Sequence, residues 1–298
     1  MAKTIFILLL FLTFFIESAE AGQKVLAILS IPIAPYEQAI MGFEQVYGSE
    51  IKRLFISESK EKDVQKTIRE IRPDMVLAVG RDALLIAGQI KTIPIVYCMV
   101  LNPRSILSGE KNISGVSMNL PPEKQLSELL KVLPVAHNIG LLYDPDQTGN
   151  FVQGVRDAAA KMDVNLTATA VHRSRDVPLL LNTMKGKAGV FWMLPDITVI
   201  TPETVESILL FSLENNIPIL TFSEQYLELG AMLSIGIDPF DIGCQAGEIA
   251  QKIFSGSAVK DVQHVDARKA LISINLKIAG KIGMTIDKEV IRNIRVIQ

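Results

Sequence analysis

The sequence has few of the features that mark metal proteins, disulfide scaffolds or nucleic-acid-binding proteins. It contains two cysteines and three histidines, and no pair of them has metal-ligand spacing. The 30 basic residues nearly balance the 32 acidic ones, and no basic run occurs. Nucleic acid and anionic membrane surfaces are therefore not expected as partners. We expect Cys98 and Cys244 to be buried free thiols, although an oxidising compartment would permit a disulfide.

Catalytic motifs are absent as well. The chain has no G-x-S-x-G elbow, no phosphate-binding loop and no G-x-G-x-x-G fingerprint. No serine and histidine are placed so that they suggest a nucleophile and its base. We therefore expect a protein that is not an enzyme and needs neither a cofactor nor a metal. An enzyme on a double flavodoxin-like fold is an alternative, which turnover of a metabolite by the purified protein would support.

An apolar run near the N-terminus predicts a signal peptide, residues 1–21. Lys3 precedes twelve residues, 5–16, of which only Thr13 is polar, and Ala19-Glu20-Ala21 follows. This pattern predicts secretion across the inner membrane into the periplasm, with cleavage after Ala21. The run is shorter than the ~20 residues that span a bilayer, so an uncleaved membrane anchor is the less favoured alternative. No cysteine ends the run, which argues against a lipid anchor.

The remaining chain alternates between apolar strands and helical patterns, and it is too long for one ordinary domain of ~100–150 residues. Nearly half of its residues are apolar and few are aromatic, which favours a large aliphatic core. This alternation predicts βαβ units with parallel sheets. In the first series, strands are expected at 25–30, 51–56, 75–79 and 95–100, and helices at 36–47, 62–71 and 82–89. Residues 101–117 then break the pattern.

A second series of the same order begins at Pro121. Its strands are expected at 139–143, 166–171 and 189–193, and its helices from 122, at 151–161, at 177–184 and from 202. Asn150 is expected to cap the helix at 151–161, and Thr201 with Pro202 to open the next one. No internal sequence repeat is present.

The stretch 218–256 organises the rest of the chain. It predicts a short buried strand at 219–222, a polar turn, a second strand at 231–237, a turn at Asp238-Pro239 and a helix ending at Gly256. Continuous apolar strands belong to sheets covered on both faces. After Gly256, a strand at 270–274 and a short helix that ends at Gly283 close the pattern.

Several spaced blocks resemble the substrate-binding proteins of ABC transporters, a family with the type I periplasmic binding protein fold that includes tryptophan and tyrosine receptors. The blocks are 113–119, IGLLYDP at 139–145, the stretch 218–256, and INLKIAGKIG at 274–283. The resemblance runs from Lys24 to about Ile291. It implies two Rossmann-like or flavodoxin-like α/β lobes joined by hinge crossovers. The expected division is 22–118 plus 239–264 for the N-terminal lobe, and 119–238 plus 265–298 for the C-terminal lobe.

Polar residues at strand ends are the candidate ligand site, because open α/β sheets bind ligands at the carboxyl ends of their strands. The candidates are Ser30, Tyr36, Gly80, Arg81, Asp82, Met99, Asn102, Tyr143, Asp144, Thr148, Asn150, Pro195, Asp196, Ser223, Glu224 and Asp238. Each of them has the alternative of being an ordinary turn or cap residue, which is the favoured interpretation of Asp238 and of Asp82.

A small zwitterion such as an amino acid would need an ammonium partner, for which Asp196 or Asp238 is the natural choice. Its carboxylate would bind hydroxyl or backbone N–H groups at the residues Ser30, Asp82, Thr148 or Asn150. Apolar walls would come from the rings of Tyr36, Tyr143 and Phe222.

The chain departs from the family pattern at three places. Many members have Asn at the position of Asp144 and Thr-Asp-Asn in place of 194–196, and the loop 31–35 is short and apolar here. These differences favour a ligand other than an aromatic amino acid, such as an amine or a polyol.

The resemblance implies a receptor that closes on a small polar solute and passes it to an ABC permease with its ATPase. A monomer is expected. The alternative is a sensory receptor read by a membrane histidine kinase, since fold alone does not separate import from sensing.

Overall fold

The computed structural model describes residues 23–56, 61–292 and 294–297. The predicted signal peptide, residues 1–21, lies outside the described residues. Within the described part of the chain, no helix is long and apolar enough to cross a membrane.

The first sheet has six parallel strands in the order β11-β5-β4-β3-β1-β2. Four of them are buried along their whole length, as expected for apolar strands in a sheet covered on both faces. The strands are β1 (Val25–Leu29), β2 (Lys52–Phe55), β3 (Met75–Val79), β4 (Ile95–Val100), β5 (Ile113–Ser117) and β11 (Val265–Asp266).

Helices cover both faces of this sheet. One apolar core contains α2 and α10, and a second core on the opposite face contains α3 and α4. The helices and 3₁₀ turns of this part are α2 (Ala34–Tyr47), α3 (Glu61–Ile71), α4 (Arg81–Ala87), η2 (Pro103–Ser105), α10 (Pro239–Phe254) and η4 (Val259–Asp261).

The second sheet has seven strands in the order β13-β12-β10-β9-β8-β6-β7. All neighbours are parallel except β10 and β12, which pair antiparallel. Its strands are β6 (Asn138–Tyr143), β7 (Asn165–Ala170), β8 (Val190–Trp192), β9 (Ile219–Thr221), β10 (Leu233–Ile237), β12 (Ala270–Asn275) and β13 (Arg295–Ile297).

The second sheet also separates two apolar cores. One contains α5, α6 and α11, and the other contains α7 and α8. The helices and the 3₁₀ turn are α5 (Pro122–Val132), α6 (Pro145–Lys161), η3 (Ser174–Asp176), α7 (Val177–Asn182), α8 (Pro202–Asn215), α9 (Gln225–Leu229), α11 (Leu276–Lys281) and α12 (Lys288–Ile291).

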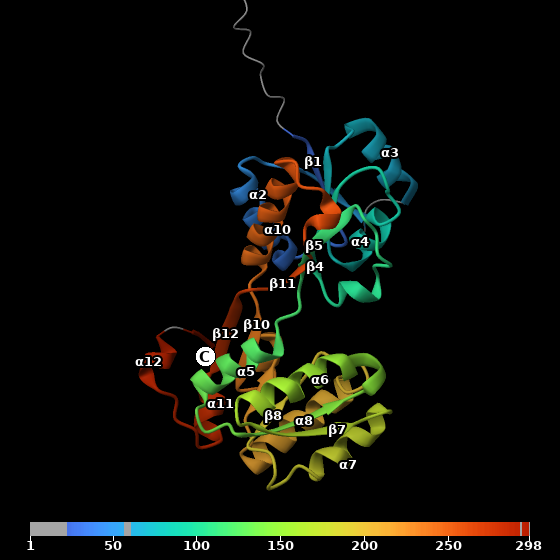
Figure 1. Ribbon diagram of the computed structural model, residues 1–298. Coiled ribbons are helices and arrows are strands. Elements are labelled where there is room, and N and C mark those ends of the chain that lie inside the picture. Colours follow the sequence, from blue (N-terminus) through green and yellow to red (C-terminus); the bar gives the residue numbers. More distant parts are fainter. Residues whose placement is uncertain (1–22, 57–60, 293, 298) are drawn as a thin grey trace, which may run out of the picture.

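Three short segments connect the two bodies, and Figure 1 shows them between the upper and lower halves of the molecule. They run from β5 to α5, from β10 to α10, and from β11 to β12. Each segment leaves its sheet at the carboxyl end of a strand. Strands β5 and β11 run parallel to the other strands of the first sheet, and β10 runs parallel to β6, β8 and β9 in the second sheet. The carboxyl ends of the parallel strands in one sheet therefore face those in the other. Ligand sites of open α/β sheets lie at such edges.

Two local predictions need correction. The helix expected at 151–161 begins at Pro145, and its cap is Asp144, whose side chain accepts from the N–H of Asp146 at 3.0 Å. Asn150 is therefore an interior residue of α6, since an Asp cap with Pro at the first helical position starts the helix earlier. The stretch 101–117, expected only as a break, contains strand β5. Thr201 does cap α8, in a capping box with Thr204.

Helix α10 packs closely against α2, which fixes the start of α10 beside the first sheet. Glycines lie at the points of closest approach. A Cβ built on Gly42 would lie 2.0 Å from the carbonyl oxygen of Phe240, and one on Gly243 would lie 1.9 Å from that of Ala39. Only glycine fits at these two positions, so the backbones of the helices touch directly.

Candidate functional site

The first half of the site consists of residues from β1, α2 and the end of β3. Ser30 Oγ accepts from the N–H of Ala83 at 3.0 Å and donates to the carbonyl oxygen of Val79 at 3.3 Å. Gly80 has φ 92°, and a Cβ there would lie 2.5 Å from the hydroxyl of Tyr36 and 2.7 Å from Ser30 Oγ. Glycine is therefore required at position 80 for two reasons: it tolerates the positive φ, and it leaves room for the side chains of Tyr36 and Ser30. The structure brings Ser30, Tyr36 and Gly80 together.

Burial affects the hydroxyl of Tyr36. Desolvation raises its pKa, and the nearby Cys98 and Asp82 raise it further. The hydroxyl therefore stays protonated at neutral pH and is able to donate a hydrogen bond to an anionic ligand group.

The helix-cap interpretation of Asp82 is wrong. Helix α4 begins at Arg81, its cap position is Gly80, and no cap side chain binds the first turn. Ser30, from a neighbouring strand, accepts the N–H of Ala83 instead. The residues Arg81 and Asp82 are exposed at the carboxyl edge of the first sheet.

The end of β4 is strained. Met99 and Asn102 have positive φ values, 56° and 49°, although neither residue is glycine. The pairing of β4 with β5 shifts register between Tyr97 and Val100, so Met99 occupies an irregular position. Such backbone strain costs about 1–3 kcal/mol and concentrates at functional sites. Asn102 is exposed at the edge, whereas the side chain of Met99 belongs to the buried core.

The second half of the site is a reciprocal brace between the start of α6, directly after β6, and the loop after β8. Asp196 Oδ2 accepts from the backbone N–H of Asp144 at 2.7 Å and from Thr148 Oγ1 at 2.6 Å. In return, Thr198 Oγ1 donates to Asp144 Oδ2 at 2.6 Å. Each side thus supplies a carboxylate to a threonine of the other. The brace fixes the loop after β8 relative to the start of α6.

Asp196 is fully engaged within the brace. Its Oδ1 accepts from the N–H groups of Thr198 and Val199, at 3.0 and 3.2 Å, so its two oxygens accept four hydrogen bonds in all. It is 1% exposed. A carboxylate has about four lone-pair sites. In this geometry Asp196 holds the loops, and it has no free acceptor position for a ligand ammonium.

Asp144 has acceptor positions to spare. Its Oδ1 accepts from the N–H of Asp146 and its Oδ2 from the hydroxyl of Thr198, which is one hydrogen bond to each oxygen. The hydroxyl of Thr198, followed by the N–H of Asp146, lowers the pKa of Asp144. The carboxylate is therefore ionised at neutral pH. Of the two carboxylates in the brace, Asp144 is the one suited to accept from a cation.

Removing the Thr198 hydroxyl is expected to raise the pKa of Asp144. The folded-state pKa lies below the unfolded value, so ionised Asp144 stabilises the fold above the unfolded pKa, and this contribution is lost as pH falls through the folded pKa. In Thr198→Val the folded pKa moves up, toward the unfolded value, whereas Thr198→Ser keeps it low. A carboxyl NMR titration measures both. An Asp144 pKa that is the same in Thr198→Val and wild type would contradict the role of the hydroxyl.

Of the three further candidates Ser223, Glu224 and Asp238, the two carboxylates are already paired. Glu224 accepts from the hydroxyl of Ser273 and forms an ion pair with Arg295 at 2.8 Å. Asp238 caps α10 and forms an ion pair with Lys269 at 2.6 Å. Their charges are compensated within the protein. Ser223 precedes Glu224 and is half-buried.

The remaining second-half candidates take no part in the brace. Tyr143 packs against an apolar core, and Pro195 and Asn150 are exposed. In the described part of the chain, no hydrogen bond or ion pair joins the first-half candidates to the second-half candidates from 143 to 224. The two halves are separate sets at facing edges.

Sequence reasoning missed two features of the edges. Thr198 carries no motif beyond its position two residues after Asp196. Large apolar side chains are also exposed at strand ends of both bodies. Ile31 and Ile33 belong to the loop noted above as apolar, whereas Leu101 and Ile197 were not singled out. Ile197 is 74% exposed. Nothing in the hydropathy of these loops distinguishes such residues from core residues. No group of three or more His, Cys, Asp or Glu residues among the described positions is placed to hold a metal ion.

Residues 48–295 match the family described as ABC transporter substrate binding protein. The chain belongs to this family. It is also 28% identical, over 214 residues, to the tyrosine-binding protein of Clostridioides difficile. That alignment covers 68% of this chain and 61% of the relative, which is less than two thirds of the relative's length.

Two solved structures share the fold along nearly the whole chain. One is the ligand-free, open structure of a substrate binding protein with adhesive properties from Clostridium difficile, with a TM-score of 0.77, 21% identity, and coverage of 93% of this chain and 99% of the other. The second is an ABC domain in complex with L-Trp from Streptococcus pneumonia, with a TM-score of 0.60, 19% identity, and coverage of 93% and 100%. The expected type I periplasmic binding protein fold is confirmed.

Proposed function

We propose that this protein is the substrate-binding component of an ABC importer, which closes around a small solute and makes or breaks no bond. The facing carboxyl edges of the two sheets, each with its own polar set, carry this proposal. A ligand that contacts both edges stabilises the closed state more than the open one, so binding shifts the population toward closure. Membership of a family of binding proteins supports the same conclusion.

We propose an amino acid with an apolar side chain as the ligand. The ionised carboxylate of Asp144 suits a protonated amine, and the protonated hydroxyl of Tyr36 suits a carboxylate. The exposed Ile31 and Ile197 would be covered by an apolar ligand body, which a polyol does not offer. The relatives described as binding tyrosine and L-Trp support this class. The expectation of a ligand other than an aromatic amino acid is therefore dropped together with the polyol, and only the expected amine group is retained.

We also propose the lobe division 22–118 plus 239–264 and 119–238 plus 265–298, with one adjustment. Strand β11, Val265–Asp266, pairs with β5 in the first sheet, which supports counting it with the N-terminal lobe. The proposed location is outside the cytoplasm, after removal of residues 1–21. The proposed partners are an ABC permease and its ATPase.

A calorimetric and thermal-shift screen with L-tyrosine, L-tryptophan and the other amino acids tests the function. A ligand at about 100 times its Kd is expected to stabilise the fold by roughly 2.7 kcal/mol. For lobes of this size that corresponds to a rise in Tm of roughly 5–10 °C. The N-acetyl derivative of the best ligand should bind much more weakly, because it has no ammonium group. Absence of binding by every amino acid, or equal binding of the N-acetyl form, would contradict the proposed ligand class.

A further inference from the structure

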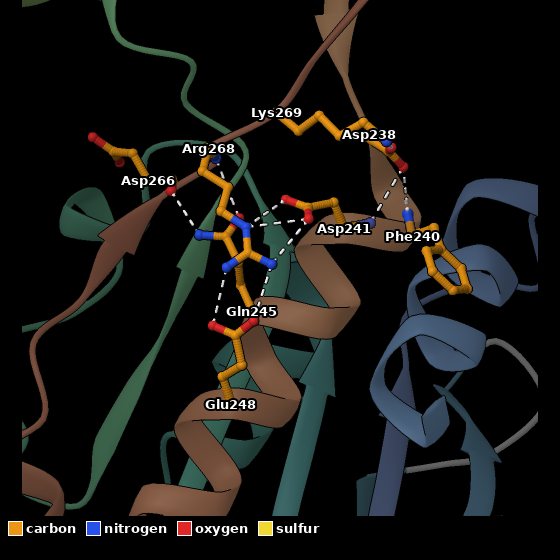
Figure 2. A network of polar contacts seen from close by, with 8 residues as sticks. All are labelled: Asp238, Phe240, Asp241, Gln245, Glu248, Asp266, Arg268 and Lys269. Atoms are coloured by element: carbon orange, nitrogen blue, oxygen red, sulfur yellow. Dashed lines mark hydrogen bonds and ion pairs between the residues drawn. The ribbon is translucent and has the colours of Figure 1, made fainter. Parts of the chain in front are cut away.

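The crossover from β11 to β12 carries an arginine with an unusual number of partners. Arg268 donates to Asp241 from Nε and Nη2 at 3.0–3.1 Å, and to Glu248 from Nη1 at 3.0 Å. Both carboxylates belong to α10, one turn and three turns into the helix. Figure 2 shows the guanidinium lying between them along the helix. The planar fork of arginine suits such contacts better than lysine does.

The backbone of the same crossover is bound to α10 as well. The N–H of Arg268 donates to Gln245 Oε1 at 3.2 Å, and Gln245 Nε2 donates to the carbonyl oxygen of Asp266 at 3.1 Å. Gln245 lies between Asp241 and Glu248 on α10, so side chain and main chain of the crossover follow one face of the helix (Figure 2). Residues 266–268 are therefore attached along about two turns of α10.

The first crossover joins the same assembly. Ser117 Oγ donates to Asp266 Oδ1 at 2.5 Å, and the N–H of Ala267 donates to the carbonyl oxygen of Asn119 at 3.1 Å. Strand β11 itself pairs with β5. Residues 117–119 and 265–268 are thus bound to each other and to the first sheet.

The attachment ends at Lys269. The Lys269 ammonium pairs with Asp238 Oδ2 at 2.6 Å, and the N–H of Asp238 donates to the Lys269 carbonyl oxygen at 3.4 Å. From Ala270 onward, the chain pairs with β10 in the second sheet. The contact between Asp238 and Lys269 therefore lies at the edge of the second sheet, where the second crossover leaves β10 and the third crossover enters β12. The adjacent carboxylates of Asp241 and Glu248 raise the pKa of the Arg268 guanidinium, which stays charged at every accessible pH.

We propose that Arg268 makes residues 265–268 a rigid part of the N-terminal lobe, so that the third crossover bends only at Lys269–Ala270. This inference rests on the proposed function for its role in closure. The two lobes then rotate relative to each other by bending at three places. These are Ile237–Asp238 in the second crossover, Lys269–Ala270 in the third, and the part of the first crossover that follows Asn119. With the fork intact, the ligand-free protein samples a narrow range of lobe orientations. Without it, residue 268 keeps only its backbone bond to Gln245, so the flexible part of the third crossover extends from Lys269 back to residue 268.

Pulsed EPR on the ligand-free protein tests the proposal. Spin labels at Glu70→Cys on α3 and Glu206→Cys on α8, both exposed, report the distance between the lobes; Cys244→Ser removes the one cysteine that is not buried. Arg268→Gln is expected to broaden the distance distribution. Arg268→Lys should restore the width only in part, because an ammonium lacks the fork. An unchanged width in Arg268→Gln would overturn the proposal.

The control is Arg53→Gln. Arg53 also forks between two carboxylates, Glu37 and Glu44, but all three lie within the N-terminal lobe away from the crossovers. This variant should keep the wild-type width, and broadening equal to that of Arg268→Gln would overturn the proposal. If Arg268→Gln fails to fold, Glu248→Gln removes one arm of the fork at an exposed carboxylate and is expected to broaden the distribution less.

A ligand-binding measurement separates this inference from the proposed function. Arg268→Gln should raise the apparent Kd by about 2- to 5-fold, because the closure-competent fraction falls while no ligand contact changes. If no amino acid binds the wild type, the proposed ligand class fails and the EPR result still decides the role of Arg268. If the ligand binds and the widths are equal, the inference about Arg268 fails alone.

Discussion

Replacing Asp144 with asparagine is expected to weaken binding of the amino acid ligand by roughly 10- to 100-fold. Hydrogen bonds to charged groups contribute about 1.5–3 kcal/mol, and the substitution removes the ionised acceptor with little change of shape. Asparagine is as good a helix cap as aspartate, so α6 keeps its start. Titration calorimetry with the ligand found in the screen measures the change.

The matched control is Asp146→Asn, two residues along the same helix start. Asp146 is exposed, and its backbone N–H, which the substitution keeps, makes the bond to Asp144. This variant should bind as the wild type does. An equal loss in both variants would indicate a general effect of negative charge at the edge, and an unaffected Asp144→Asn would exclude Asp144 as the ammonium acceptor.

Gly243→Ala is expected to cause the largest loss of stability among single methyl additions. The new Cβ would lie 1.9 Å from the carbonyl oxygen and 2.7 Å from the carbonyl carbon of Ala39. Both are backbone atoms of α2, so the clash is relieved only if the two helices move apart. Such overpacking costs about 1–3 kcal/mol, and a backbone clash belongs at the upper end. Thermal unfolding should show a Tm lower by roughly 5–10 °C.

Gly280→Ala is the matched control, because it adds the same methyl group to a helical glycine that has free space around it. A Cβ at Gly280 would meet nothing within 4 Å. The substitution should be neutral or stabilise by about 0.4–1 kcal/mol, because alanine restricts the unfolded chain. A Gly243→Ala protein as stable as Gly280→Ala would show that α2 and α10 do not pack backbone against backbone.

The alternation of apolar strands with helices made most of the fold predictable. Three of the four buried strands of the first sheet, β1, β3 and β4, are continuous apolar runs, and such runs can be recognised without tertiary information. Strand β5 was missed because its sequence, ISGVS, contains two serines and a glycine. Its burial depends on neighbours contributed by β4 and β11, which no local pattern reports.

The start of α6 shows how two local signals compete. Asp144-Pro145 is a good cap and first position, but Gly149-Asn150 also suggests a boundary, and the sequence-based choice fell on the later one. Glycine inside a helix costs roughly 1 kcal/mol relative to alanine, which the tertiary packing of α6 against α5 offsets.

The sequence predicted which strand ends form the candidate site, but it did not predict what each residue does there. Residue type and position identified Asp144, Thr148 and Asp196. Their roles depend on contacts across 48 to 54 positions of sequence, since Asp196 binds Thr148 and the Asp144 N–H while Thr198 binds Asp144. The four hydrogen bonds that occupy the Asp196 carboxylate cannot be seen in the sequence. In the fold it is Asp144, which accepts only two, that has acceptor positions left for a ligand.

Small-angle X-ray scattering with and without saturating ligand tests the central claim most directly, which is that the facing edges close on the solute. Closure brings the two lobes together, so the radius of gyration and the maximum dimension should both fall when ligand is added. Asp144→Asn should require correspondingly more ligand for the same change. Scattering curves that coincide while calorimetry shows the binding site filled would contradict closure between the lobes.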